Sequence, residues 1–251
     1  MRILITAGGT SERIDQVRSI TNHSTGRLGK TIAASFTQSI DALQIDYVTT
    51  KRAVLPQQTS ALTFYFIEST TDLLSTLKQL MTTHTYDVVI HSMAVSDFTP
   101  AVHLNEHTLL DTWRTHAPTT TEEFDVWLDT LQAAQEKATK IGSADAEHLI
   151  LVLNKTPKII QFIRTWQPQT ILVGFKLLVD VSKEHLLDVA RENLKKNQAD
   201  FTLANDLTEI TDAQHHGYLV AANGEITEGN TKQELAEQLV QAVLSKKESF
   251  A

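Results

Sequence analysis

Two glycine-rich turns near the start of the chain could surround an anion with backbone N–H groups. An apolar run over residues 2–6 ends at Gly8-Gly9, and a second turn over residues 24–29 opens into an apolar helical segment. Glycine turns and helix N-termini of this kind bind phosphate groups. Arg18 and Asn22 lie between the turns, four residues apart, and could bind a phosphate and a polar group of one ligand. The segment therefore indicates a site for phosphorylated molecules.

The two turns match neither common nucleotide-binding motif. Residues 24–31 are close to the P-loop pattern G-x-x-x-x-G-K-[ST], but Ser24 replaces its first glycine. A P-loop also follows its strand directly, whereas a long polar spacer separates this stretch from residues 2–6. The dinucleotide fingerprint G-x-G-x-x-G is missing as well. Taken alone, the second turn could simply be the start of a helix.

Polar loops follow four more of the expected strands. These loops hold Asp97, Lys158, Phe175 and Asn205. Ligands of open α/β sheets bind outside the carboxyl ends of the strands, so the four loops suggest one shared site. Each residue has a simpler alternative, because Asp97 could cap a turn and Phe175 could be plain core. Lys196, in the last turn of an expected helix, could be a partner of the helix dipole.

The elements that would position these residues follow an α/β pattern, in which strand-like apolar runs alternate with helix-period segments. The expected strands are 2–6, 45–49, 63–67, 87–91, 148–153, 170–175 and 201–204. The expected helices are 29–39, 71–82, 157–166, 183–197 and 231–246. Thr156 is the expected N-cap of the third helix, with Pro157 at its first position. Residues 218–227 form a hairpin pattern around Asn223-Gly224. This predicts an α/β fold with a predominantly parallel sheet flanked by helices and a C-terminal β-hairpin.

Residues 101–147 interrupt the alternation. They are rich in Thr, His and Glu and have weak strand character, so we interpret them as an insertion that serves as a lid, arm or dimer contact. Residues 14–22 are too polar for a strand and too irregular for a surface helix. Glycine and proline are too sparse for a linker, so we expect a single domain over residues 1–251.

Composition excludes several classes of protein. The 251 residues are 41% apolar and 21% charged, which is typical of globular proteins. A net charge of −8 argues against a nucleic-acid partner. We expect no membrane segment and no signal peptide. The chain has no cysteine, which excludes disulfides and thiolate nucleophiles and fits a cytoplasmic protein.

Residue patterns also narrow the chemistry. The ten histidines show no metal-ligand spacing, so we predict no metal-binding residues, and no G-x-S-x-G elbow is present. This favours catalysis by positioning and charge stabilisation over a covalent enzyme intermediate.

Six motifs, in this order along the chain, identify a family. They cover residues 5–10, 14–29, 94–98, 155–159, 173–176 and 204–206. In combination they resemble the phosphopantothenate–cysteine ligases, also called phosphopantothenoylcysteine synthetases, over residues 2–206, with a similar C-terminal hairpin and helix. The chain is most similar to the stand-alone form found in streptococci and their relatives. We therefore expect the decarboxylase that is fused to this enzyme in many bacteria to be encoded separately.

The resemblance implies a ligase of coenzyme A biosynthesis on a Rossmann-like sheet. The carboxylate of 4′-phosphopantothenate attacks the α-phosphate of a nucleoside triphosphate and releases pyrophosphate. The amine of L-cysteine then attacks the acyl-nucleotide and releases a nucleoside monophosphate. Bacterial members use CTP, with ATP as the alternative, together with Mg²⁺, and they form homodimers. A nicotinamide-dependent oxidoreductase and a non-catalytic nucleotide-binding regulatory protein are the competing hypotheses.

The resemblance also implies roles for individual residues. Asn22 and Lys140 are implied to be catalytic, Lys140 in a mobile loop that serves the cysteine-coupling step, with Lys137 as the alternative. The implied substrate-binding residues are Arg18, Asn22, Ala94 and Asp97, of which Arg18 reaches phosphopantothenate across the dimer interface. The implied nucleotide-binding residues are Gly8, Ser24, Gly26, Gly29, Asp97, Lys140, Pro157, Lys158, Ile159, Ile160, Phe175, Lys196 and Asn205.

Overall fold

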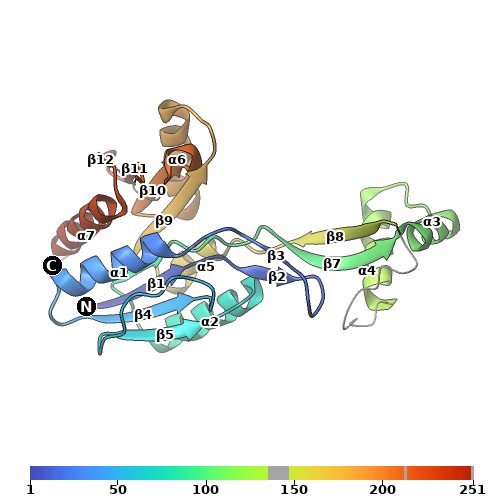
Figure 1. Cartoon of the computed structure of the whole chain (residues 1–251), viewed down its shortest axis with the longest axis horizontal. Coiled ribbons are helices and arrows are strands. Elements are labelled where there is room, and N and C mark those ends of the chain that lie inside the picture. Colours follow the sequence, from blue (N-terminus) through green and yellow to red (C-terminus); the bar gives the residue numbers. More distant parts are fainter. Residues whose placement is uncertain (135–146, 212–213, 250–251) are drawn as a thin grey trace. The chain divides into compact units, whose positions relative to one another are not determined.

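The computed structural model describes residues 1–134, 147–211 and 214–249, which form two compact units (Figure 1). Unit 1 consists of the described residues of Met1–Thr10, Asn22–Val95 and Lys158–Ala251. Unit 2 consists of those of Ser11–Thr21 and Ser96–Pro157. Lys140 lies outside the described residues. The assignment of residues 1–251 to a single domain stays a prediction, as does the lid or dimer-contact role of residues 101–147.

Unit 1 is built on one eight-stranded sheet. In spatial order its strands are β12 (Ile226–Gly229), β11 (Gly217–Ala221), β10 (Phe201–Asp206), β9 (Ile171–Leu178), β6 (Val88–His91), β1 (Arg2–Ala7), β4 (Gln44–Thr49) and β5 (Leu62–Phe66). The pairs from β5 to β10 are parallel, and the C-terminal hairpin adds β11 and β12 in antiparallel pairs. The predicted mainly parallel α/β sheet and its C-terminal hairpin are thus confirmed.

Helices cover both faces of this sheet. They are α1 (Arg27–Ser39) and α7 (Lys232–Glu248) on one face, and α2 (Thr70–Thr83), α5 (Ile159–Trp166) and α6 (Lys183–Asn197) on the other. β1 shows how the layers form: Ile3 and Ile5 pack with α1 and α7, while Leu4 packs on the opposite side. Strands buried on both faces read as continuous apolar runs, which is why the sequence predicts them well.

The start of α5 differs from the prediction. Its N-cap is Lys158, and Thr156, predicted as the N-cap, belongs to unit 2. The buried Thr156 hydroxyl donates to the carbonyl of Ser96 at 2.5 Å, and its backbone N–H donates to Asp97 O at 3.0 Å. Thr156 therefore fixes the end of a strand pair instead of capping the helix.

Unit 2 contains two antiparallel ribbons and two helices. These elements are β2 (Ser11–Arg13), β3 (Ser19–Thr21), β7 (Phe98–Asn105), β8 (Leu149–Lys155), α3 (Glu106–Thr115) and α4 (Thr121–Ala134). The prediction that residues 148–153 form a strand of the parallel sheet is wrong, because β8 pairs antiparallel with β7. The prediction that residues 14–22 are too polar for a strand is also wrong, because β3 lies there and pairs with β2. A short ribbon needs backbone pairing more than an apolar face.

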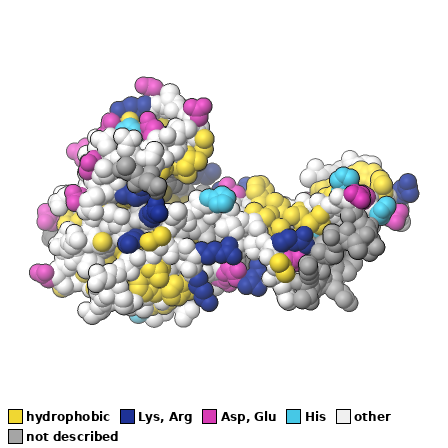
Figure 2. Space-filling view, viewed as in Figure 1, with side chains coloured by type: hydrophobic (Ala, Val, Ile, Leu, Met, Phe, Trp, Pro, Cys, Tyr) yellow, Lys and Arg dark blue, Asp and Glu magenta, His cyan; other side chains and the backbone are white. Residues whose placement is uncertain are grey.

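Hydrophobic side chains gather over β7, β8 and α3 on the face shown in Figure 2. Trp113 of α3 is 44% exposed and Val126 of α4 is 67% exposed. A groove of 1080 Å³ is lined by these two helices. Contiguous exposed apolar surface of this kind marks interaction sites. In the described part of the chain, no helix combines the length and hydropathy needed to cross a membrane.

Candidate functional site

The chain segments that leave β1 and β6 run side by side at the carboxyl edge of the unit 1 sheet. Ala94 N–H donates to Gly8 O at 2.9 Å, and Thr10 N–H donates to Ala94 O at 3.0 Å. The sheet is extended in one direction from β1 through β4 and in the other through β6. This is the point of a doubly wound sheet at which the strand order reverses and ligands bind.

Asn22 is held against these segments by its backbone. Its N–H donates to Thr10 O at 3.3 Å, and its carbonyl accepts from Ser24 N–H at 3.0 Å. A Cβ added to Gly9 would lie only 2.3 Å from the Asn22 carbonyl oxygen. Gly9 is therefore the residue that lets the Asn22 turn approach the end of β1.

Glycines bring the N-terminus of α1 onto the same edge. Gly8 and Gly26 have positive φ angles of 92° and 72°, which residues with side chains rarely adopt. A Cβ on Gly26 would lie 3.4 Å from Gly8 N, and one on Gly29 would lie 2.5 Å from the Cβ of Ala7. The predicted residues Gly8, Asn22, Ser24, Gly26, Gly29 and Ala94 thus come together at the ends of β1 and β6.

Two helix N-termini in unit 1 differ from the other described helices. α1 and α5 lack a side-chain hydrogen bond from the N-cap residue and an acidic residue in the first turn, although the Thr25 hydroxyl accepts from Arg27 N–H of α1 at 3.4 Å. In contrast, α2, α3, α6 and α7 each have both, for example Ser69 with Asp72 in α2. An uncapped N-terminus presents backbone N–H groups and a positive dipole end to an anion. These two helices carry predicted phosphate or nucleotide residues at their N-termini, whereas the predicted Lys196 lies in the last turn of the capped α6.

The N-terminus of α5 lies against β9. Ile160 Cδ1 would be 3.1 Å from a Cβ added to Gly174, so this glycine lets α5 pack close to the strand. Phe175 is part-buried on the opposite face, beside the cluster of α1 and α7. β9 continues to Leu178, so Phe175 lies within the strand and not at its end as the sequence suggested. Ile160 of α5 thus packs on one face of β9, and Phe175 lies on the other face.

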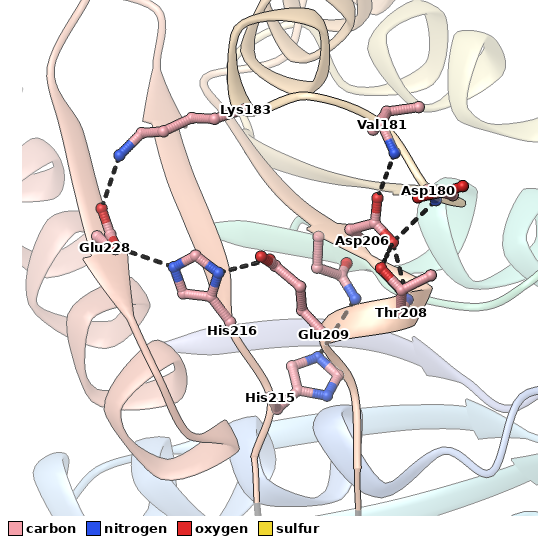
Figure 3. Close-up of polar contacts among 10 residues, drawn as sticks. Asp180, Val181, Lys183, Asp206, Thr208, Glu209, His215, His216 and Glu228 are labelled. Atoms are coloured by element: carbon pink, nitrogen blue, oxygen red, sulfur yellow. Dashed lines mark hydrogen bonds and ion pairs between the residues drawn. The ribbon is translucent and has the colours of Figure 1, made fainter.

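Polar contacts fix the loops that follow β9 and β10 (Figure 3). The Asp206 carboxylate accepts from Asp180 and Val181 N–H at 3.1 and 2.8 Å, and from the backbone and hydroxyl of Thr208. These four hydrogen bonds hold the pKa of Asp206 well below its usual range. Asp206 therefore ties the loop after β9 to the turn after β10. In the sequence, Asp206 is recognisable only as part of a family motif.

Asn205 lies next to Asp206 and contacts a histidine. Its Nδ2 atom lies 3.4 Å from His215 Nε2. Burial and the nearby charge of Lys232 lower the pKa of His215 to about 4, so its neutral ring can accept this hydrogen bond. His216 bridges Glu209 and Glu228, and Lys183 binds the same Glu228 at 3.0 Å (Figure 3). Hydrogen bonds from its ring to these carboxylates raise the pKa of His216 despite its partial burial.

His91 is a buried residue at the end of β6 that the sequence analysis did not single out. Its Nδ1 lies 3.0 Å from the hydroxyl of Thr6, which also accepts from Met93 N–H at 3.3 Å. Burial lowers the pKa of His91 to about 4. The neutral imidazole thus helps to fix the turn that carries Ala94. Its position as the last residue of a buried strand was the signal that the sequence offered, although a lone histidine has no distinctive spacing.

Four predicted residues do not join this group. Arg18, Asp97 and Pro157 belong to unit 2. Lys196 is in the last turn of α6, which connects the parallel strands β9 and β10 and therefore ends at their amino edge. There the backbone of Asp200 donates to Leu172 O, at the start of β9. Lys196 thus lies on the edge of the sheet opposite to the carboxyl ends.

Unit 2 holds its predicted residues in two places. Asp97 and Pro157 flank the contact between Asp97 O and Thr156 N–H. Arg18 lies in the loop between β2 and β3, where its guanidinium binds Asp15 at 2.7 Å. Among the described residues, no group of three or more His, Asp or Glu side chains is arranged to hold a metal ion.

Known proteins with similar sequences or structures point to one family. A crystal structure of the DNA/pantothenate metabolism flavoprotein from Streptococcus pneumoniae is 43% identical, with a TM-score of 0.83, over 98% of this chain and 99% of that chain. A coenzyme A biosynthesis bifunctional protein CoaBC from Thermococcus kodakarensis is 28% identical over 95% of this chain and 49% of its own length. The chain therefore spans about half the length of the curated relatives it matches.

A more distant structure, that of a Cab2 H337A mutant in complex with phosphopantothenate-cysteine, shares the fold. It is 17% identical, with a TM-score of 0.68, over 99% of this chain and 86% of that chain. The family described as the DNA/pantothenate metabolism flavoprotein C-terminal domain matches residues 1–110 and 130–246. This match covers most of the chain, and the streptococcal structure agrees with it over nearly the full length. The chain belongs to the family of DNA/pantothenate metabolism flavoprotein C-terminal domains.

Proposed function

We propose that this protein is a phosphopantothenate–cysteine ligase, which joins 4′-phosphopantothenate and L-cysteine in coenzyme A biosynthesis. Membership of the pantothenate metabolism family supports this, as does the likeness to a bifunctional coenzyme A biosynthesis protein. The fold is also that of a Cab2 structure solved with phosphopantothenate-cysteine.

The observation that carries the proposal is the group of uncapped N–H donors beside Asn22. The first step brings together two anions, a carboxylate and a triphosphate, so the protein must neutralise charge and hold the reactants in line. The N-terminus of α1 supplies the positive end of the helix dipole and backbone N–H donors. Asn22, fixed against Gly9, lies in the same group and supplies an amide for the attacking acid.

The nucleotide would bind at the ends of the unit 1 strands. We assign the triphosphate to the turn residues Gly8, Ser24, Gly26 and Gly29, and the remainder of the nucleotide to the start of α5, Phe175 and Asn205. The second uncapped helix, α5, supports this assignment, since its N–H groups and dipole suit a polyanionic ligand. Lys196 is left out of this site because α6 carries it to the opposite edge of the sheet.

The reaction would proceed in two steps. The phosphopantothenate carboxylate, oriented by Asn22 and Ala94, attacks the α-phosphorus, and the bond to the β-phosphate breaks to release pyrophosphate. The cysteine amine then attacks the acyl carbon, loses a proton and expels the nucleoside monophosphate, which leaves an amide. Lys140 is proposed to serve this second step. Arg18 and Asp97 are proposed to bind phosphopantothenate, and Asp97 and Pro157 to contact the nucleotide.

The finer properties are proposals as well. We propose CTP as the nucleotide, with ATP as the alternative, and a cytoplasmic enzyme that acts with a separately encoded decarboxylase. Mg²⁺ would bind to the phosphates of the nucleotide, as it does in many enzymes of this type, since no described cluster of His, Asp or Glu forms a metal cage. A homodimer is supported by the exposed apolar side chains of unit 2, such as Trp113.

One assay tests the proposal against its competitors. The purified protein is incubated with phosphopantothenate, cysteine, Mg²⁺ and each of CTP, ATP, GTP and UTP. We expect equimolar release of pyrophosphate and nucleoside monophosphate, fastest with CTP. Binding of a nucleotide without any release would favour the non-catalytic regulatory protein. Activity that instead requires a nicotinamide cofactor would favour an oxidoreductase, although the turn after β1 lacks the usual glycine fingerprint.

A further inference from the structure

The loop between β2 and β3 is organised around one buried carboxylate. The Asp15 side chain has no exposed surface, whereas that of Arg18 is 43% exposed. Asp15 Oδ1 accepts from the backbone N–H groups of Val17 and Arg18 at 2.8 and 2.7 Å. Asp15 Oδ2 accepts from Nε and Nη2 of Arg18 at 3.2 and 2.7 Å. One carboxylate oxygen thus shapes the turn, and the other holds the guanidinium.

We propose that Asp15 is a positioning residue that holds the Arg18 guanidinium in place to bind the phosphate of phosphopantothenate. The inference rests on the proposed function, in which Arg18 binds that phosphate. A free arginine side chain has many rotamers, and ordering it upon binding lowers affinity. Because Asp15 already orders Arg18 in the free protein, much of this cost is removed before the substrate arrives. Arginine remains charged next to a carboxylate, so the guanidinium still attracts the phosphate.

The geometry differs from that of an ordinary surface ion pair of the same spacing. Asp188 and Arg191 on α6 are also three residues apart, but a single contact of 2.8 Å joins them and both side chains are at least half exposed. Such pairs contribute little and move freely. Asp15 is instead buried, and both of its carboxylate oxygens accept hydrogen bonds. Two nitrogens of the Arg18 guanidinium therefore bind a carboxylate whose own position is fixed. The pair of Asp188 and Arg191 therefore provides a matched control.

The test compares the natural acid with pantothenate, which lacks the phosphate. Full-length wild type, Asp15→Asn, Arg18→Ala, the double variant and the Asp188→Asn control are assayed by pyrophosphate release at saturating nucleotide and cysteine. The Asn side chain keeps an oxygen for the turn but places an amide donor against the guanidinium. We expect Asp15→Asn to raise the KM for phosphopantothenate by roughly 2- to 12-fold, the effect of freeing one long side chain. Its kcat, and its kcat/KM for pantothenate, should equal those of wild type.

In the Arg18→Ala background, Asp15→Asn should cause no further increase in the KM for phosphopantothenate. Asp188→Asn should leave the kinetic constants for both acids unchanged. An equal loss with both acids, an additive loss in the double variant, or a lower KM for phosphopantothenate would each overturn the proposal. If Asp15→Asn does not fold, Arg18→Lys gives the answer with Asp15 intact, because an ammonium cannot replace both nitrogen contacts. If the KM of Arg18→Lys for phosphopantothenate then equals that of wild type, the positioning role of Asp15 is refuted.

Failure of the proposed function has a different signature. If Arg18→Ala prefers phosphopantothenate over pantothenate to the same degree as wild type, Arg18 does not have the assigned role. Wild type that releases no pyrophosphate with any nucleotide would remove the ligase itself. An effective Arg18→Ala beside an ineffective Asp15→Asn would refute only the positioning role.

Discussion

Replacing Gly9 with alanine should displace Asn22 without disturbing any other proposed contact directly. The added Cβ would lie 2.3 Å from the Asn22 carbonyl oxygen, and real Cβ atoms essentially never approach closer than 3.0 Å. The obstacle is backbone and cannot rotate away, so the backbone at Asn22 or at residue 9 must shift until the two atoms are at least 0.7 Å further apart. Gly9 does not have a positive φ, so alanine can adopt its backbone conformation and the effect is steric alone.

This displacement should reduce activity more than stability. Overpacking of this kind costs about 1–3 kcal/mol, which corresponds to a fall in Tm of roughly 2–12 °C for a chain of this size. A misplacement approaching 1 Å can cost about 100-fold in rate. We therefore expect kcat for pyrophosphate release to fall by about 10- to 100-fold in Gly9→Ala, measured beside a thermal melt.

A second glycine separates the two effects. Gly224, in the turn between β11 and β12, has a φ of 95° and no atom within 4 Å of an added Cβ. Gly224→Ala is therefore strained by about 1–3 kcal/mol but displaces nothing. It should lower Tm to a similar degree and leave kcat unchanged. A Gly9→Ala enzyme with the kcat of wild type would refute the reasoning. So would a Gly224→Ala enzyme whose kcat falls as far as that of Gly9→Ala.

Three more predictions concern the coupling step, the helix N-terminus and pH. In the absence of cysteine, Lys140→Ala should still form the acyl-nucleotide, detected by mass spectrometry, and an enzyme that cannot form it would contradict the assigned role. Arg27→Glu places an acid in the first turn of α1, which favours the helix by about 0.3–1 kcal/mol but should raise the nucleotide KM. Lys232→Glu at the same position of the capped α7 should leave that KM unchanged. Because burial lowers the pKa of His91 from 6.5 to about 4, only the unfolded chain binds a proton between these values. The free energy of unfolding should therefore fall by up to about 3 kcal/mol as the pH falls from 6.5 to 4, and urea titrations of His91→Asn should show a shallower dependence.

The sequence predicted unit 1 well because its strands are buried on both faces. The strands from β1 to β10 in unit 1 have nearly continuous apolar runs that end at polar loops, and periodicity detects such runs directly. The Asn223-Gly224 turn identified the hairpin for a similarly local reason. Unit 2 carries no such signal. β2 and β3 are polar, and their pairing depends on a loop closed by Asp15, which hydrophobicity cannot show.

The site was predictable only where its chemistry is local. Glycine turns identified the edge where Gly8, Gly26 and Gly29 meet, because their tight packing requires the residue type itself. Lys196 was misplaced because residue type does not show at which edge of the sheet a helix ends, whereas the direction of the connection does. His91 was missed because a lone histidine after a strand has no distinctive spacing. Its meaning depends on Thr6, which lies 85 positions away in the sequence.

The distribution of helix caps shows which helices lack the stabilisation that an N-cap provides. A side-chain N-cap is typically worth about 1 kcal/mol, and the described helices α2, α3, α6 and α7 each have one together with an acidic first turn. The N-cap residues of α1 and α5 make no such bond and the first turns hold no acid, although the Thr25 hydroxyl accepts from Arg27 N–H at 3.4 Å. A carboxylate in either first turn would stabilise the helix and repel a triphosphate. α2 and α6 also begin at the carboxyl edge, after β5 and β9, and are capped. The missing caps therefore distinguish the starts of α1 and α5, where a bound polyanion would satisfy the same N–H groups.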